Sequence, residues 1–224
     1  MDIQAIAKRV LFDLVDSIKA TDTERIIADR AVSLLAGHGI TETWYYDCPV
    51  FVLLGSRSCL SVSGRSYIPG DEPVGLFNLV TVDISPLRSG VWGDCARSFP
   101  VEEGRCTLTP LVPELAHGMQ VEPALHRAMQ AFVTPSTTFQ ELFDFGNTEI
   151  RRSGFENLDF LGNLGHSIVS KREDRRYIEP GNSMQLGAVP FFTFEPHIRQ
   201  IAGIWGFKHE EIYYFDSQEL LRTL

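Results

Sequence analysis

The sequence predicts an α+β fold, because helical and strand-like patterns follow one another along the chain in the order helices, strands, helices, strands. No tandem repeat, low-complexity tract or linker interrupts the 224 residues. We therefore expect one domain over residues 1–224, built as two α+β halves that share one system of sheets.

Two helices are expected first. Apolar residues recur every three or four positions over residues 1–20, which is typical of an amphipathic helix. Thr21, followed three residues later by Glu24, matches a capping box and predicts the start of a second helix. That helix should end at Gly37 or Gly39, since glycine favours helix C-termini.

Strands are expected next. Residues 43–46, 50–54 and 79–84 are rich in β-branched and aromatic residues, and a Ser-, Gly- and Pro-rich loop occupies residues 61–73. A further, acidic strand is expected over residues 94–101.

The second half begins with helices. Residues 115–132 keep a helical rhythm, although Pro123 is expected to kink or break the helix. Another helix should start near Thr138, with Gly154 at its C-terminal cap. Short strands are then expected around residues 167–170, 189–195 and 210–215.

Composition excludes several classes of protein. A formal net charge of -9 without clustered Lys and Arg argues against nucleic-acid binding. The longest apolar stretch, residues 49–55, is too short to cross a bilayer, and Asp2, Lys8 and Arg9 do not fit a signal peptide, so we expect a cytoplasmic protein with no membrane partner. Reduced packing thiols are expected at Cys48, Cys59, Cys95 and Cys106.

Two aspartates of the strand block are expected to face one polar cleft. A loop with Pro and Gly separates Asp83 from Asp94, so a hairpin would bring their carboxylates together. Thr81 and Ser85 share the face of Asp83, whereas the alternate residues are apolar and face a core. Small residues beside Asp94 leave room for ions, although such a pair alone also fits a solvated turn.

Four motifs then follow one another: VTVDISPLRSGVWGDCARSFPVEEG, NLGHSIVS, FFTFEPHI and GFKHEEIYYF. Together they resemble the pita-bread metallopeptidases, which include methionine aminopeptidase, aminopeptidase P, prolidase and the metal-free creatinase. The similarity covers about residues 22–215. It implies the pita-bread (creatinase/aminopeptidase) fold, in which two pseudo-symmetric halves carry curved antiparallel sheets covered by helices.

The resemblance also implies a dinuclear metal site. Asp83 would bind one metal, Asp94 and Glu210 would bridge both metals, and His166 and Glu195 would bind the other. Four carboxylates around one point would repel one another and stay largely protonated unless cations compensate, and two divalent ions would balance them. Carboxylates with one imidazole suit Mn, Fe, Co or Zn.

Strand alternation separates Glu210 from its neighbour. Adjacent strand residues point to opposite sides, so only one of Glu210 and Glu211 can reach the ions. The family register favours Glu210 and leaves Glu211 with His209 on the other face. In such enzymes a metal-held hydroxide attacks a carbonyl, and Glu195 is expected to take and pass on the proton.

Two outer histidines of the family are missing from this chain. The first should lie within residues 62–70, which offer Arg65 and Tyr67 instead, and the second falls near Glu173. Their loss removes transition-state stabilisation and puts ordinary peptide hydrolysis in question. We expect Arg65, Tyr67 and Trp92 to contact the substrate.

Other residues near the motifs have two readings each. His197 is expected to be catalytic if the chain stays extended after Glu195, and otherwise is a surface histidine. Glu173 and its neighbouring arginines form a solvated cluster or supply one arginine for a substrate carboxylate. A small-molecule pocket or simple core packing explains the aromatic residues Trp44, Tyr45, Tyr46, Trp92 and Trp205.

The expected function is a dinuclear metal-dependent hydrolase that acts on a short peptide or an amino-acid-derived amide. The alternative is a metal-dependent non-peptidase enzyme on a small molecule, such as a C–N hydrolase, a lyase or an iron-dependent oxidative catalyst. A noncatalytic binding module is the third hypothesis. Because the long N-terminal domain of aminopeptidase P, prolidase and creatinase is lacking, a homodimer is expected, in which a second subunit supplies the lid.

Overall fold

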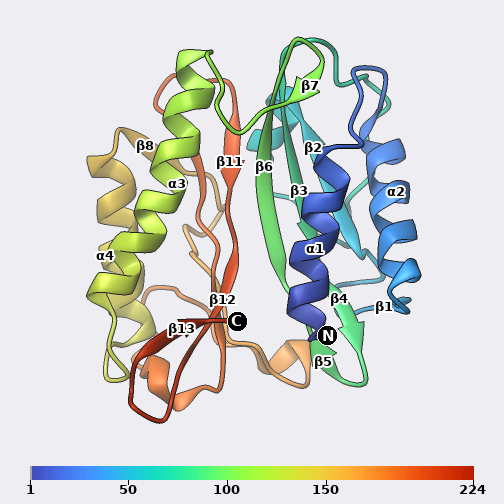
Figure 1. Ribbon diagram of the computed structural model, residues 1–224. Coiled ribbons are helices and arrows are strands. Elements are labelled where there is room, and N and C mark those ends of the chain that lie inside the picture. Colours follow the sequence, from blue (N-terminus) through green and yellow to red (C-terminus); the bar gives the residue numbers. More distant parts are fainter. Residues whose placement is uncertain (1) are drawn as a thin grey trace.

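The computed structural model describes residues 2–224 and consists of two halves that lie side by side (Figure 1). In the N-terminal half, α1 (Ile3–Val15) and α2 (Glu24–Gly37) cover one face of a sheet. In the C-terminal half, α3 (Pro113–Phe132) and α4 (Phe139–Arg152) form the outer layer. This arrangement of two helix-covered halves agrees with the predicted fold.

The N-terminal half contains two antiparallel sheets, with strand orders β2-β3-β6-β7 and β1-β4-β5. A 3-10 helix, η1 (Gly55–Cys59), follows β2. The strands are β1 (Glu42–Thr43), β2 (Val50–Leu54), β3 (Asn78–Ile84), β4 (Pro86–Arg88), β5 (Val91–Trp92), β6 (Cys95–Glu102) and β7 (Arg105–Cys106).

The C-terminal half contains two three-stranded antiparallel sheets, β11-β10-β8 and β13-β12-β9. Two 3-10 helices, η2 (Arg172–Asp174) and η3 (Leu186–Ala188), lie in its loops. The strands are β8 (Phe155–Asn157), β9 (Phe192–Phe194), β10 (His197–Gln200), β11 (Gly206–Lys208), β12 (Glu211–Phe215) and β13 (Leu221–Thr223).

Each half has its own hydrophobic core, and Leu79 of β3 packs into the core of the C-terminal half. In the first, Val10 and Leu14 of α1 pack with Val82 of β3, and all three side chains are fully buried. In the second, Phe139 of α4 and Phe192 of β9 are fully buried. Burying each such side chain contributes about 1.5–3 kcal/mol. The halves meet where β11 contacts β3 and β6 (Figure 1).

Several predicted boundaries need correction in the N-terminal half. The first helix ends at Val15 rather than at residue 20. Thr23, not Thr21, caps the second helix, because its side chain accepts the Ile26 N–H at 3.3 Å. The strand expected at residues 43–46 stops at Thr43, since Tyr46 adopts a φ of 49° and turns the chain.

The second half shows two further differences. Helix α3 continues through Pro123 instead of breaking there, because Leu115 and Leu125, on either side of the proline, are both anchored in the core. The strand expected at residues 167–170 is reduced to isolated bridges at His166 and Ser167. The helix expected to start near Thr138 does so, and Thr138 caps it through a capping box with Glu141.

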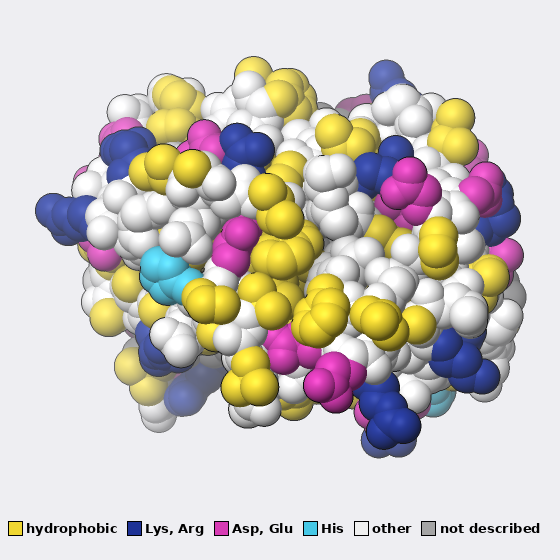
Figure 2. Space-filling view, turned by 90° about the horizontal axis from the view of Figure 1, so that it is seen from above, with side chains coloured by type: hydrophobic (Ala, Val, Ile, Leu, Met, Phe, Trp, Pro, Cys, Tyr) yellow, Lys and Arg dark blue, Asp and Glu magenta, His cyan; other side chains and the backbone are white. Residues whose placement is uncertain are grey.

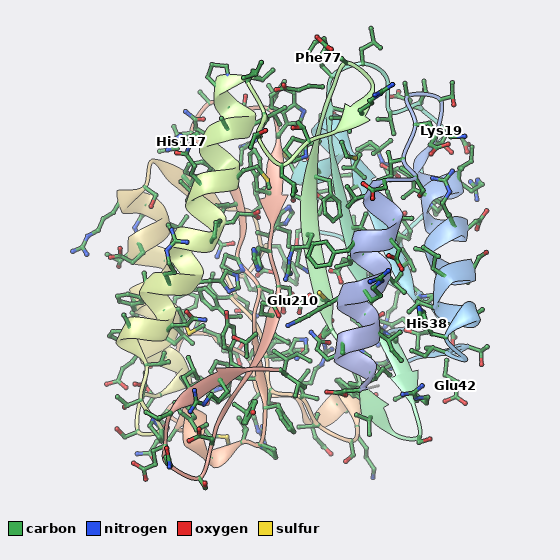
Figure 3. The ribbon with its side chains drawn as sticks, in the orientation of Figure 1. Lys19, His38, Glu42, Phe77, His117 and Glu210 are labelled. Atoms are coloured by element: carbon green, nitrogen blue, oxygen red, sulfur yellow. The ribbon has the colours of Figure 1, made fainter. Side chains whose placement is uncertain are left out.

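Figure 2 looks onto the end of the molecule where Figure 3 places Phe77, and shows hydrophobic side chains across the middle of this face between charged groups. Phe77 is 57% exposed.

Within residues 2–224, none of the helices combines the length and the apolar character that crossing a membrane requires.

Candidate metal centre

The β3–β6 hairpin brings the two aspartates together. In its antiparallel register Asp83 lies opposite Ala96, and Asp94 lies one residue before β6, so both carboxylates occupy one face. Helix α1 holds Asp94 in place: the buried Gln4 side chain donates to the Asp94 carbonyl at 2.7 Å and accepts its N–H at 2.8 Å. The first helix therefore positions a residue 90 positions away.

His166 enters the same space from the other half. Its Nδ1 donates to the Ser167 carbonyl at 3.0 Å, which leaves the Nε2 lone pair free to bind a cation. Nε2 lies 3.5 Å from Asp94 Oδ2 and 3.8 Å from Glu195 Oε1. Burial lowers the pKa of His166 to about 4, so the imidazole is neutral at pH 7.

A glycine makes the close approach of His166 to β9 feasible. Gly165 has a φ of +141°, and a Cβ there would lie 2.3 Å from the Thr193 carbonyl oxygen. Thr193 then clamps the next residue, because its Oγ1 accepts the His166 N–H at 3.0 Å and its own N–H donates to the His166 carbonyl at 2.7 Å.

Glu210 lies between the two halves (Figure 3). Its N–H donates to the Ala96 carbonyl at 3.0 Å, and its own carbonyl accepts from Arg97 Nη1 at 2.7 Å. Glu211 points the other way, to Lys8 Nζ at 2.6 Å and to the Arg97 guanidinium. Strand alternation thus separates the two glutamates, as expected from the sequence.

Lys208 also enters the carboxylate cluster, which we did not foresee. Its Nζ lies 2.6 Å from Asp83 Oδ2, 3.0 Å from Glu195 Oε2 and 3.9 Å from Glu210 Oε2. The signal was available, since residues two apart in a strand share a face and Lys208 precedes Glu210 by two. The register of β11 supports this, because Lys208 lies opposite His197.

The four carboxylates differ in the direction of their pKa shifts. Burial raises the pKa of Asp83, although the Lys208 ammonium opposes the shift. Burial, together with neighbouring carboxylates, raises the pKa values of Asp94 and Glu210 well above the usual range. Burial also acts to raise the pKa of Glu195, but Lys208 and His166 outweigh it and the net shift is downward. Burial alone would lower the pKa of Lys208, yet the acids around it raise it, so the ammonium stays charged.

Three groups are suited to holding a cation. Asp94 Oδ2 and both Glu210 carboxylate oxygens are buried and have no hydrogen-bond partner within residues 2–224. One ligand atom from each of Asp94, His166 and Glu210 lies within 4.8 Å of the others. Unsatisfied buried carboxylate oxygens are costly, and a bound metal ion would satisfy them. The residues present therefore fit a metal ion.

A cavity of about 440 Å³ opens above this cluster. Its walls include Trp44, Tyr45 and Phe51. The Arg175 guanidinium also lines it, 5.3 Å from the Trp44 ring centre and 5.2 Å from that of Tyr177. The cavity is therefore aromatic with one arginine, and its volume is in the range of small-ligand sites, about 300–1,000 Å³.

His197 also lines this cavity. Its Nε2 donates to the Ser58 carbonyl at 2.6 Å, and burial lowers its pKa to about 4. The ring is therefore neutral, with one nitrogen committed to the backbone of η1.

The three residues expected to contact substrate lie outside the cavity lining. Tyr67 is held by Val52, whose carbonyl accepts from its hydroxyl at 2.9 Å. Trp92 is buried and stacks on Trp44 at 4.3 Å, behind the wall. Arg65 is exposed, and its guanidinium carbon lies 4.4 Å from the centre of the Tyr46 ring. Of the aromatic residues for which the sequence left a pocket role and core packing open, Trp44, Tyr45 and Tyr46 line the cavity, whereas Trp92 and Trp205 do not.

The sequence matches the profile of metallopeptidase family M24 over residues 2–216. The chain belongs to this family. The M24 match and the structural neighbours below confirm the resemblance and the pita-bread fold. No curated protein matches the sequence significantly.

Solved M24 structures share the fold at low sequence identity. The X-Pro aminopeptidase from Thermotoga maritima matches with a TM-score of 0.80 and 20% identity, over 98% of this chain and 58% of its own. The prolidase from Pyrococcus furiosus gives 0.78 and 17%, over 98% and 60%. The methionine aminopeptidase from Rickettsia prowazekii gives 0.70 and 16%, over 97% and 92%. The chain thus spans somewhat over half the length of the first two.

Proposed function

We propose that this M24 chain is a metal-dependent hydrolase that cleaves the amide bond of a short peptide or an amino-acid-derived amide. The observation that carries the proposal is the convergence of Asp94, His166 and Glu210, within 4.8 Å, at an aromatic cavity. Family membership supports the same reading, since the fold neighbours include an X-Pro aminopeptidase and prolidases.

In this proposal Asp94, His166 and Glu210 hold the metal. A bound Mn, Fe, Co or Zn ion supplies a Lewis acid that polarises a carbonyl and acidifies a bound water. Glu195 is the general base, because it faces the cluster, with Oε1 3.8 Å from His166 Nε2, and is ionised. Thr193 supports Glu195, since its hydroxyl donates to Glu195 Oε1 at 3.4 Å. His197 borders the cavity beside this base and shapes the approach of the substrate.

The cavity wall suggests how a substrate is oriented. Aromatic rings of Trp44, Tyr45 and Phe51 offer an apolar surface for a side chain. Arg175, the arginine within the cavity lining, can pair with a carboxylate in a bidentate manner. We therefore expect a preference for substrates with a free carboxylate.

The test is turnover by chelated protein reloaded with Mn, Co, Fe or Zn, on dipeptides and tripeptides with free or amidated carboxyl ends. We expect Asp94→Asn to abolish turnover, because it removes a charged ligand. Arg175→Met should lower kcat/KM about 10–100-fold for free carboxylates, equivalent to about 1.4–2.8 kcal/mol, and much less for amides. Arg176→Met is the control, since Arg176 is exposed and outside the cavity lining. Full turnover by Asp94→Asn would contradict the proposal.

A second candidate is a metal-dependent enzyme of a different reaction class. Within residues 2–224, the histidines that line the cavity are His166 and His197, and His197 is already bound to a backbone carbonyl. The wall thus lacks the outer imidazoles of the peptidase pattern. A metabolite screen under nitrogen and under air separates hydrolysis from oxidative chemistry, because only the latter needs oxygen.

The cytoplasmic location and the homodimer expected from the sequence stay predictions, and light scattering checks the homodimer.

A further inference from the structure

The expected metal ligands are not equivalent in this structure. Oxygens of Asp83 and Glu195 are already paired with the Lys208 ammonium, at 2.6 Å and 3.0 Å. Buried oxygens of Asp94 and Glu210, in contrast, have no hydrogen-bond partner among the described residues. The five residues therefore separate into three that fit a metal ion and two that hold a lysine.

The position of Lys208 is built into the fold. Its N–H donates to Ser98 Oγ at 2.8 Å, and Ser98 Oγ also lies 2.9 Å from Thr81 Oγ1 on the neighbouring strand. All three residues lie where β11 crosses β3 and β6. The side chain of Lys208 is 17% exposed and enters the cluster from the same face as its register partner His197.

Charge and space then favour one metal ion over two. A metal at Asp83 and Glu195 would need their oxygens at about 2.0–2.2 Å, but the ammonium occupies the space between those oxygens. A divalent ion beside the ammonium would also be repelled by it. Once deprotonated to bind a cation, Asp94 and Glu210 together would carry two negative charges, which a single divalent ion balances.

We propose that the Lys208 ammonium replaces the second metal ion, so that this chain binds one divalent metal, at Asp94, His166 and Glu210, while Asp83 and Glu195 serve as counter-ions of the lysine. The proposal rests on the proposed function in that both require a metal at this cluster. It changes the expectation of two ions to one, and it assigns Lys208 a role in metal stoichiometry.

The test counts metal ions per chain. Wild-type protein is saturated with Mn, passed through a desalting column and measured by plasma mass spectrometry. We expect one Mn per chain in the wild type and in Lys208→Arg, which keeps the positive charge. Lys208→Met keeps the apolar stem and removes the charge, so it should bind two. The control Lys19→Met changes an exposed lysine distant from Glu210 in Figure 3 and should leave one.

Each outcome separates the two proposals. No Mn in any protein would overturn the proposed function, whereas two Mn in the wild type would overturn only the lysine substitution. One Mn in Lys208→Met would equally refute the role of Lys208, provided that circular dichroism shows it folded. If Lys208→Met does not fold, wild-type spectra decide: electron paramagnetic resonance at saturating Mn should show an isolated six-line signal, and an exchange-coupled pair would refute the proposal.

A second pair of variants needs no change at Lys208. Asp83→Asn should keep Mn binding within about tenfold of wild type, because Asp83 contacts the lysine in this scheme. Glu210→Gln should weaken binding at least 100-fold, because it removes a metal ligand. Equal losses in both variants would contradict the division of the ligands.

Discussion

The link between Gln4 and Asp94 gives a prediction that can be worked out in free energy. Gln4→Met keeps the length and the helix propensity of the side chain but removes both hydrogen bonds to the Asp94 backbone, at 2.7 Å and 2.8 Å. Gln4 is fully buried, so water cannot replace the lost partner. Leaving a buried N–H and a buried C=O unpaired costs about 1–3 kcal/mol each, and we expect a loss of ~2–6 kcal/mol.

Urea denaturation of the chelated protein measures this loss from the shift of the midpoint at constant slope. The matched control is Gln140→Met, because the exposed Gln140 accepts one N–H, from Gly181, at 3.0 Å. It should change stability by less than about 0.5 kcal/mol. A Gln4→Met loss as small as that of the control would refute the claim that α1 holds Asp94, the proposed metal ligand, in place. Mn affinity should also fall in Gln4→Met, since Asp94 loses its anchor.

Two further predictions concern packing and pH. Gly165→Ala should lower the free energy of unfolding by more than about 3 kcal/mol, because its Cβ would meet the Thr193 carbonyl oxygen at 2.3 Å. Gly154→Ala has nothing within 4 Å and a φ of +78°, so it should cost only about 1–2 kcal/mol. Thermal melts that rank the two variants equally would contradict this. Burial raises the pKa of Glu122 from 4.5 to about 8, so the folded state holds its proton more tightly and the wild type should lose stability as pH rises between these values. The isosteric Glu122→Gln has no carboxyl proton to lose and should not show this pH dependence. Urea unfolding at pH 5 and pH 8 tests this, and a difference in unfolding free energy between the two proteins that is the same at both pH values would contradict the prediction.

The parts of the site that follow strand alternation could be predicted from the sequence. Asp83 and Asp94 on one face of a hairpin, and the opposite directions of Glu210 and Glu211, need only the two-residue period of a strand. The same rule places Lys208 beside Glu210, but the sequence pattern alone does not show that the lysine ammonium pairs with these carboxylates.

Other features depend on distant parts of the chain. Gln4 reaches Asp94 only because α1 packs across the end of β6, and no local pattern contains that contact. Trp92 does not reach the cavity because Trp44 stacks over it. This aromatic residue of the first motif therefore packs behind the cavity wall. The run through Pro123 reflects core packing that outweighs local preference.

The two separately packed cores have a mechanical consequence. Asp94 comes from one half, and His166 and Glu210 come from the other. A bound cation would therefore cross-link the two halves. Chelation should therefore accelerate amide exchange along β11 and the facing edge of β6 before it affects either interior. The same division means that two fragments of the chain, cut between β7 and α3, should reassemble more tightly when the ion is supplied.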